Sequence, residues 1–290
     1  MMRPRRRLST AVVLLLGLVS LPGPGNVAPA TASSSCAYDP LDSTVTVAAV
    51  TETLDVTLVD GRSLRLAGIA APLATATSPD LPARARQALV AWGAAPGGVV
   101  LHVLAPGPDR WGRVGALLFR KDKPDSAAEA LIQAGLARAR PESAAHACFP
   151  ALLAAEAEAR NQRRGLWVDP RYAVLDASDA EGLAVQGGDM ALVQGILHQH
   201  QGRGALYLAL GRDRWGFVAI VSRRDALRFA KAGFDVADYE GTPVRLRGDL
   251  DLRFGARMRL TDPDAVESLE PGSLGPEPDA KHWTARARPR

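Results

Sequence analysis

An Asp-Gly pair between two apolar, β-branched runs is the feature that most narrows how the first half of this chain can fold. Asp60 and Gly61 separate LDVTLV from RSLRLAGI, and VTVAAV comes shortly before them. Asp-Gly favours the backbone of a tight hairpin turn, and β-branched residues favour strands. We therefore expect a β-hairpin within residues 44–66.

The pattern then alternates between strand and helix up to Gly165, which is expected to end a helix. A run of strands with inserted and closing helices predicts a mainly β domain with added helices, of the α+β class. The expected elements are a helix at 79–92 with Ser78 as its cap, strands at 99–104 and 114–119, and helices at 127–137 and 149–164.

A second β domain is expected after a polar stretch. Residues 173–188 are rich in Asp, Ser and Gly with little periodicity, which is typical of a linker. Five short strands with one helix between the third and fourth predict a small closed barrel. These strands are expected at 191–197, 205–210, 216–221, 243–248 and 257–260, and the helix at 224–232. The expected regions are a signal (1–32), a first domain (33–172), a linker (173–188), a second domain (189–270) and a disordered basic tail (271–290).

The N-terminus has the pattern of a secretory signal. Four arginines precede the apolar run from Ala11 to Leu21, and Ala30-Thr31-Ala32 supplies small residues for cleavage after Ala32. The apolar run is about half of the ~20 residues that a spanning helix needs, which disfavours an uncleaved anchor. Lipidation at Cys36 is disfavoured because the three residues before it are serines, and a lipidation site needs an aliphatic residue there. We expect an exported protein, periplasmic or secreted, with no transmembrane segment after cleavage.

Export changes how the charge is interpreted. Removal of residues 1–32 takes away four arginines and no acids, which leaves 31 basic residues against 31 acidic ones. The sequence pI of about 9.4 therefore describes the precursor. A neutral mature chain lacks the broad basic surface of a non-specific nucleic-acid binder, although local patches are compatible with it.

Cys36 and Cys148 are the two cysteines of the chain. An oxidising compartment favours one disulfide between them, and the alternative is a pair of free buried thiols.

Four segments in the first region resemble the thermonuclease (staphylococcal nuclease-like) family. They are RLAGIAAP from Arg65, DRWGR from Asp109, LIQAGLAR from Leu131, and EAEAR from Glu156 followed by GLW at Gly165. The resemblance implies an OB-type five-stranded barrel with added helices, and Cys148 resembles the exported bacterial branch. GILHQHQGRGALYLALG and YEGTPVRLRG resemble a smaller OB-like barrel that often follows such nucleases.

The resemblance also implies which side chains would perform the chemistry. Cutting a phosphodiester with one metal requires carboxylates for the cation, a group that orients water, and cations that stabilise the phosphate. The two phosphate-binding arginines of the family correspond to Arg65 and Arg113. The two metal-binding aspartates correspond to Thr53 (or its neighbour Leu54) and Ala70, and the water-orienting glutamate to Leu73. We therefore expect the calcium site of the family to be lost, with no cofactor in its place.

Two nearby acids could restore a metal site. Glu52 and Asp55 lie on the expected strand, but a shift of one residue turns a side chain to the other face of a sheet. Asp55 would therefore reach the cleft only if a bulge intervenes. If either acid points into the cleft, a nuclease remains possible. Arg65 and Arg113 could otherwise be ordinary barrel residues paired with carboxylates.

Other features favour unremarkable roles. His198 and His200 alternate on an expected strand, but without a visible third metal ligand a solvated face is favoured. Trp111 and Trp215 could stack on bases but are more often packing residues. The tail Lys281–Arg290 could touch phosphates or a membrane, although a solvated tail is the default.

The favoured hypothesis is an exported protein that binds an anionic ligand or a protein partner, with nucleic acid as a weaker candidate. The alternatives are a weak or metal-rewired phosphodiesterase acting on DNA or RNA, and a structural envelope protein that uses both barrels as interaction surfaces.

Overall fold

A computed structural model describes Cys36 and residues 43–104, 107–121, 126–202, 204–211 and 216–274, without the side chains of 200–202. The expected signal, Trp215 and residues 275–290 of the expected tail lie outside these ranges. The described residues group into one compact unit. Within the described ranges, no helix is both long and apolar enough to cross a membrane.

Six strands of the first region curl into a barrel. The sheet order is β1-β6-β7-β4-β3-β2. β1 and β2 are separated by Thr46 alone, yet β1 pairs with β6 and β2 with β3, so this one stretch of chain joins both edges of the sheet. The strands are β1 (Ser43–Val45), β2 (Val47–Val50), β3 (Asp55–Leu58), β4 (Ser63–Leu66), β6 (Val99–Val103) and β7 (Arg113–Arg120). The arrangement confirms the expected OB-type fold.

The hairpin expected around Asp60-Gly61 is formed by β3 and β4. Gly61 has a φ of 87°, a left-handed conformation that glycine adopts without a steric cost. Side chains of a strand alternate between its two faces, and Val56, Leu58, Leu64 and Leu66 are all buried in the core. The opposite face of the same hairpin carries Asp55 opposite Arg65.

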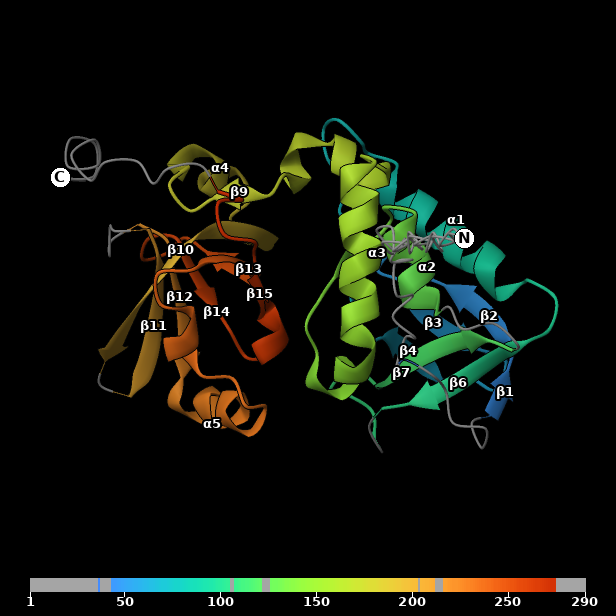
Figure 1. The fold of residues 1–290 in the computed structure, drawn as a ribbon. Helices are drawn as coiled ribbons and strands as arrows, with labels where there is room; N and C mark the ends of the chain where they lie inside the picture. Colours follow the sequence, from blue (N-terminus) through green and yellow to red (C-terminus); the bar gives the residue numbers. More distant parts are fainter. Residues whose placement is uncertain are drawn as a thin grey trace, which may run out of the picture. The chain divides into compact units, whose positions relative to one another are not determined.

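Three helices cover the core of this barrel (Figure 1). They are α1 (Leu81–Gly93), α2 (Ala127–Gln133) and α3 (Phe149–Asn161). A short strand pair, β5 (Ile69–Ala70) with β8 (Arg138–Ala139), lies beside them. α1 begins later than expected, with Asp80 and not Ser78 at its cap position.

α2 and α3 both end several residues earlier than the sequence pattern indicates. Gly135 and Gly165 follow them with positive φ angles of 67° and 51°. A Cβ atom on Gly135 would lie 2.2 Å from the carbonyl oxygen of Arg164. The two chain segments therefore touch backbone to backbone, and this contact stops both helices.

The second region forms a small closed barrel, as expected. β10 pairs with both β11 and β13, and β12 and β14 complete a ring in the order β10-β11-β12-β14-β13. The elements are β10 (Met190–Gly202), β11 (Ala205–Leu210), β12 (Val218–Ser222), α5 (Arg223–Lys231), β13 (Pro243–Asp251) and β14 (Arg257–Arg259), with β15 (Val266–Ser268) paired to β13.

The stretch 173–188, expected to be a linker, contains β9 (Leu175–Asp176) and α4 (Ala180–Val185). β9 pairs in parallel with β10, and Leu175, Ala177 and Leu183 belong to the core of the second barrel. The polar residues that suggested a linker have a local structural role, because the Asp179 side chain accepts a hydrogen bond from Gly182 and caps α4.

Cys36 and Cys148 form the expected disulfide, across a sequence separation of 112 residues. Both are buried in a small apolar cluster that includes Ala67, Leu117 and Phe119. The bond fixes the start of the described chain to the residue directly before α3.

A buried ion pair joins the two barrels. The side chain of Arg247, on β13, is fully buried and donates to Glu156 Oε2 on α3 at 2.9 Å and to the carbonyl oxygen of Ala139 at 3.1 Å. Its other terminal nitrogen donates to Glu267 at 3.0 Å. Glu156 Oε1 accepts from the main-chain N–H of Ala139 at 2.8 Å.

Loss of the disulfide is expected to destabilise the protein strongly. A closed loop of 112 residues corresponds to about 4–5 kcal/mol of unfolded-state entropy. Urea unfolding of the oxidised protein and of the Cys36→Ser/Cys148→Ser variant measures the difference. Equal stability of the two proteins would contradict this role.

Breaking the Arg247–Glu156 pair is expected to cost about 3–5 kcal/mol, because Arg247→Met leaves the buried Glu156 carboxylate with the longer, 3.9 Å ion pair to Arg160 in place of a direct hydrogen bond. Arg253→Met is the matched control, since Arg253 pairs with Asp251 at the surface with 81% of its side chain exposed; a change within about 0.5 kcal/mol is expected for it. Similar losses in both variants, measured by chemical denaturation, would refute the buried role of Arg247.

Candidate functional site

A turn between β2 and β3 comes directly before Asp55. The main-chain N–H of Leu54 donates to Thr51 O at 3.1 Å, and that of Thr51 donates to Asp55 O at 2.9 Å. Leu54 has a φ of 63°, unusual for a residue with a bulky side chain. Its side chain is buried in the core. Asp55 needs no bulge to face Arg113, because it pairs with Arg65 in the β3–β4 register and lies on the face opposite buried Val56. The register shift between β2 and β3 lies elsewhere, at Val47 and Ala49.

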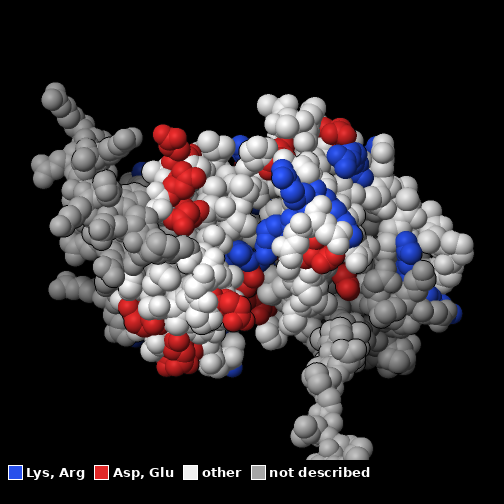
Figure 2. All heavy atoms as spheres, turned by 45° about the horizontal axis from the view of Figure 1, so that its top comes forward, with Lys and Arg blue, Asp and Glu red and all other residues white. Residues whose placement is uncertain are grey.

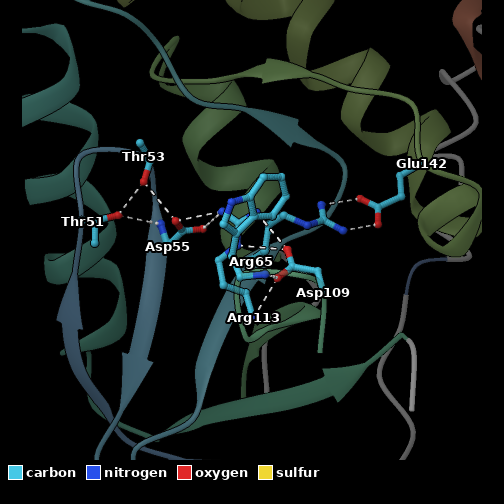
Figure 3. Close-up of polar contacts among 8 residues, drawn as sticks. Thr51, Thr53, Asp55, Arg65, Asp109, Arg113 and Glu142 are labelled. Carbon is cyan, nitrogen blue, oxygen red and sulfur yellow. Dashed lines mark hydrogen bonds and ion pairs between the residues drawn. The ribbon is translucent and has the colours of Figure 1, made fainter. Parts of the chain in front are cut away.

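Arg113 is held between two carboxylates (Figure 3). Its Nη1 lies 3.0 Å from each carboxylate oxygen of Asp55. Its Nε and Nη2 donate to Asp109 Oδ2 at 3.1 and 2.9 Å. The other oxygen of Asp109 accepts from the main-chain N–H groups of Trp111 and Arg113. Asp109 and Arg113 thus form one rigid turn before β7.

Arg65 reaches a different carboxylate (Figure 3). Its Nη1 and Nη2 donate to the two oxygens of Glu142 at 2.9 and 2.6 Å. Glu142 comes directly before the 3₁₀ helix Ser143–Cys148. A Cβ on Gly115, the neighbour of Arg65 on β7, would lie 3.3 Å from Arg65 Nη2, so glycine leaves room for the guanidinium here.

The charges of the cluster affect one another. The hydrogen bonds that Arg65 donates to Glu142 raise the pKa of Arg65, and those that Arg113 donates to Asp109 raise the pKa of Arg113. Burial alone would raise the pKa of Asp109, but the hydrogen bonds from Arg113 and Trp111 outweigh it and lower that pKa below its usual value. With all five groups ionised, two arginines face three carboxylates. The cluster then carries one net negative charge.

Trp111 lies at the open side of this cluster. Its side chain is 63% exposed, so it is not the packing residue that the sequence favours. The guanidinium carbons of Arg110 and Arg113 lie 3.8 and 4.8 Å from its ring centroid. These are cation–π distances, which hold the indole against the arginines.

The positions where the family resemblance implies acids carry other side chains. Thr53 donates to Asp55 Oδ2 at 3.1 Å and lies 2.8 Å from the Thr51 hydroxyl. Ala70 lies on β5, opposite Arg138. Leu73 is half-exposed, and its main chain bonds twice with the Tyr172 hydroxyl. Glu52 is exposed at the tip of its turn.

Within the described residues, no group of three or more His, Cys, Asp or Glu side chains could hold a metal ion. His198 Nδ1 lies 3.1 Å from Glu240 Oε1. The side chain of His200 is not among those that the structure describes.

Sequence reasoning did not single out Asp109 or Glu142. Asp109 had a local signal, because an Asp four residues before an Arg, in a turn, is placed to bond both the turn and the guanidinium. Glu142 is 77 residues from Arg65 in sequence. No local pattern connects them.

Residues 63–169 match the family model described as Staphylococcal nuclease homologue. The match includes Arg65, Asp109, Arg113 and Glu142, and it supports the thermonuclease-like resemblance. It begins after Asp55 and ends before the second barrel. No curated protein matches the chain. We refer below to the first barrel and its helices as the nuclease-like domain.

The lowered pKa of Asp109 predicts a pH dependence of stability. An acid whose pKa is lower in the fold than in the unfolded chain stabilises the fold when ionised. This contribution is complete above the unfolded value of about 3.9 and is lost as pH falls through the lower, folded pKa. The free energies of unfolding of wild type and Asp109→Asn should therefore differ at pH 7 and converge toward pH 3. A constant difference across this range would contradict the assignment, and Glu158→Gln, on the exposed side of α3, is the control.

Proposed function

We propose that this is an exported protein whose nuclease-like domain binds an anionic ligand or a protein partner and does not cut nucleic acid with calcium. One observation carries the proposal. Arg65 and Arg113 lie in one cluster of charged side chains, whereas Thr53, Ala70 and Leu73 stand where the family resemblance implies the metal-binding and water-orienting acids.

The donor set of the cleft does not fit calcium. Calcium takes six to eight oxygen ligands, usually with several carboxylates. Asp55 does point into the cleft, but both of its oxygens accept from Arg113 Nη1, and a guanidinium at 3.0 Å opposes a second cation. Ala70 and Leu73 have no side-chain oxygen. We therefore derive no catalytic step through a metal.

Guanidinium groups suit the anionic groups of a ligand. Their planar fork donates two parallel hydrogen bonds to a phosphate or a carboxylate, as Arg65 does to Glu142. Arg65 keeps 36% of its side chain exposed and so remains within reach of solvent. Exposed Trp111 adds an aromatic surface beside Arg113.

Export is supported by two features. The N-terminal pattern predicts a signal cleaved after Ala32, and the Cys36–Cys148 disulfide suits an oxidising compartment such as the periplasm or the exterior.

Charge favours a compact ligand or a protein over a long nucleic acid. On the face shown in Figure 2, a central patch of basic side chains has acidic side chains close beside it, and further basic side chains lie apart from this patch. A strand of nucleic acid would follow a continuous basic groove. The neutral composition of the predicted mature chain agrees with this preference.

The second candidate is a weak or metal-rewired phosphodiesterase. The observation in its favour is the carboxylate of Asp55, which lies beside Arg113 and Thr53. The three carboxylates of the cluster are all paired with arginines, so such hydrolysis would be slow, since each missing acid or base removes about 10²–10⁴-fold of rate.

The two functions differ in their response to calcium. We expect calcium to leave the melting temperature of the purified mature protein unchanged, because a bound ion stabilises only a protein with a site for it. We also expect no calcium-dependent cleavage of single-stranded DNA. Cleavage that is abolished by Arg113→Ala and retained by the surface variant Arg253→Ala would establish the phosphodiesterase instead. Repeating the assay with manganese tests a rewired site.

A further inference from the structure

The Glu142 carboxylate accepts the two hydrogen bonds of the Arg65 guanidinium that the anionic group of a ligand would accept. The contact is bidentate, at 2.6 and 2.9 Å, and uses both terminal nitrogens of the guanidinium. The carboxylate is one-quarter exposed, so the pair lies at the edge of the cleft and not in the core. An external phosphate or carboxylate can take the same two hydrogen bonds only when Glu142 leaves.

The charge of the cleft leads to the same conclusion. With Glu142 in place, the two paired arginines face three carboxylates, so neither Arg65 nor Arg113 has positive charge left uncompensated for a further anion. Displacement of Glu142 frees Arg65 and leaves Arg113 neutralised by Asp55 and Asp109. Arg65 is therefore the cation that can be exchanged between an internal and an external anion.

The segment that carries Glu142 is held by the second barrel. We call residues 140–146 the strap. Arg140 forms a bidentate pair with Asp249 on β13, at 3.0 and 2.7 Å. Ser143 donates to Asp262, and His146 Nδ1 lies 2.8 Å from Asp264.

The two ends of the strap are anchored in the nuclease-like domain. The main-chain N–H of Arg140 donates to Gly68 O at 2.8 Å, and the disulfide at Cys148 follows the other end. Glu142 thus lies midway in a short segment fixed at both ends and clamped from the side.

We propose that Glu142 is a built-in competitor for the anion site at Arg65, and that the second barrel controls the site by holding the strap. This inference rests on the proposed anion-binding function. The second barrel then acts as a regulatory element, because a partner that draws it away from the strap would release Glu142 and open Arg65.

Binding of inorganic phosphate to the mature protein with its disulfide intact, measured calorimetrically at low salt, tests the competitor. If Glu142 pairs with Arg65 about nine-tenths of the time, Glu142→Gln strengthens phosphate binding about tenfold. Glu158→Gln removes the same charge from α3 and is expected to leave binding unchanged. Arg65→Ala, combined with Glu142→Gln, is expected to abolish the gain. Melting curves of all variants confirm that each is folded.

Variants of the second barrel test whether it controls the anion site through the strap. Asp249→Asn/Asp264→Asn loosens the strap without touching the cleft, and we expect it to strengthen phosphate binding several-fold in the wild-type background. The same change in the Glu142→Gln background should add nothing, since the competitor is already gone. An equal gain in both backgrounds would overturn control by the barrel.

The outcomes separate the inference from the function on which it rests. Equal phosphate binding by wild type, Glu142→Gln and Glu158→Gln, still lost on Arg65→Ala, would leave the anion site standing and overturn the competitor. No phosphate binding by any variant would overturn the anion site itself and the competitor with it.

Discussion

The contacts of the buried Glu156 carboxylate join the two barrels, and the rest of the structure depends on them. One oxygen accepts from the Ala139 main chain, which fixes β8, and the other accepts from Arg247 of the second barrel. Replacing a buried ion pair with apolar residues is often tolerated, whereas removing one partner is not. Glu156 therefore ties α3, the entry to the strap and β13 to one another. The tie reaches Ala139, directly before the strap that carries Glu142.

Arg65 and Arg113 have the same role in the family resemblance, but their ion-pair partners differ. Arg113 is bound by Asp109, four residues away in the same turn, and by Asp55. Such a local, multiply bonded cation behaves as part of the framework. Arg65 has a partner from a distant segment at the edge of the cleft. The cleft thus combines one structural cation with one that is open to exchange.

Sequence patterns predicted the parts of the fold that depend on local periodicity. The hairpin at Asp60-Gly61, the five strands of the second barrel and the Cys36–Cys148 pair all followed from spacing and compartment. The contacts of Asp55 did not, because Arg113, its ion-pair partner, lies 58 residues away in the sequence. Glu142 was missed because its role comes from tertiary structure alone. A linker was expected at 173–188 because an aspartate that caps a helix cannot be told from a loop aspartate by composition.

The glycine contact between the ends of α2 and α3 has a meaning beyond packing. Gly135 and Gly165 touch so closely that neither tolerates a side chain, and both lie within the residues that match the nuclease family. This steric constraint applies to the two glycines whether or not the domain performs any reaction. Sequence similarity to a family can therefore reflect packing constraints, such as a contact between two backbones, independently of the chemistry for which the family is known.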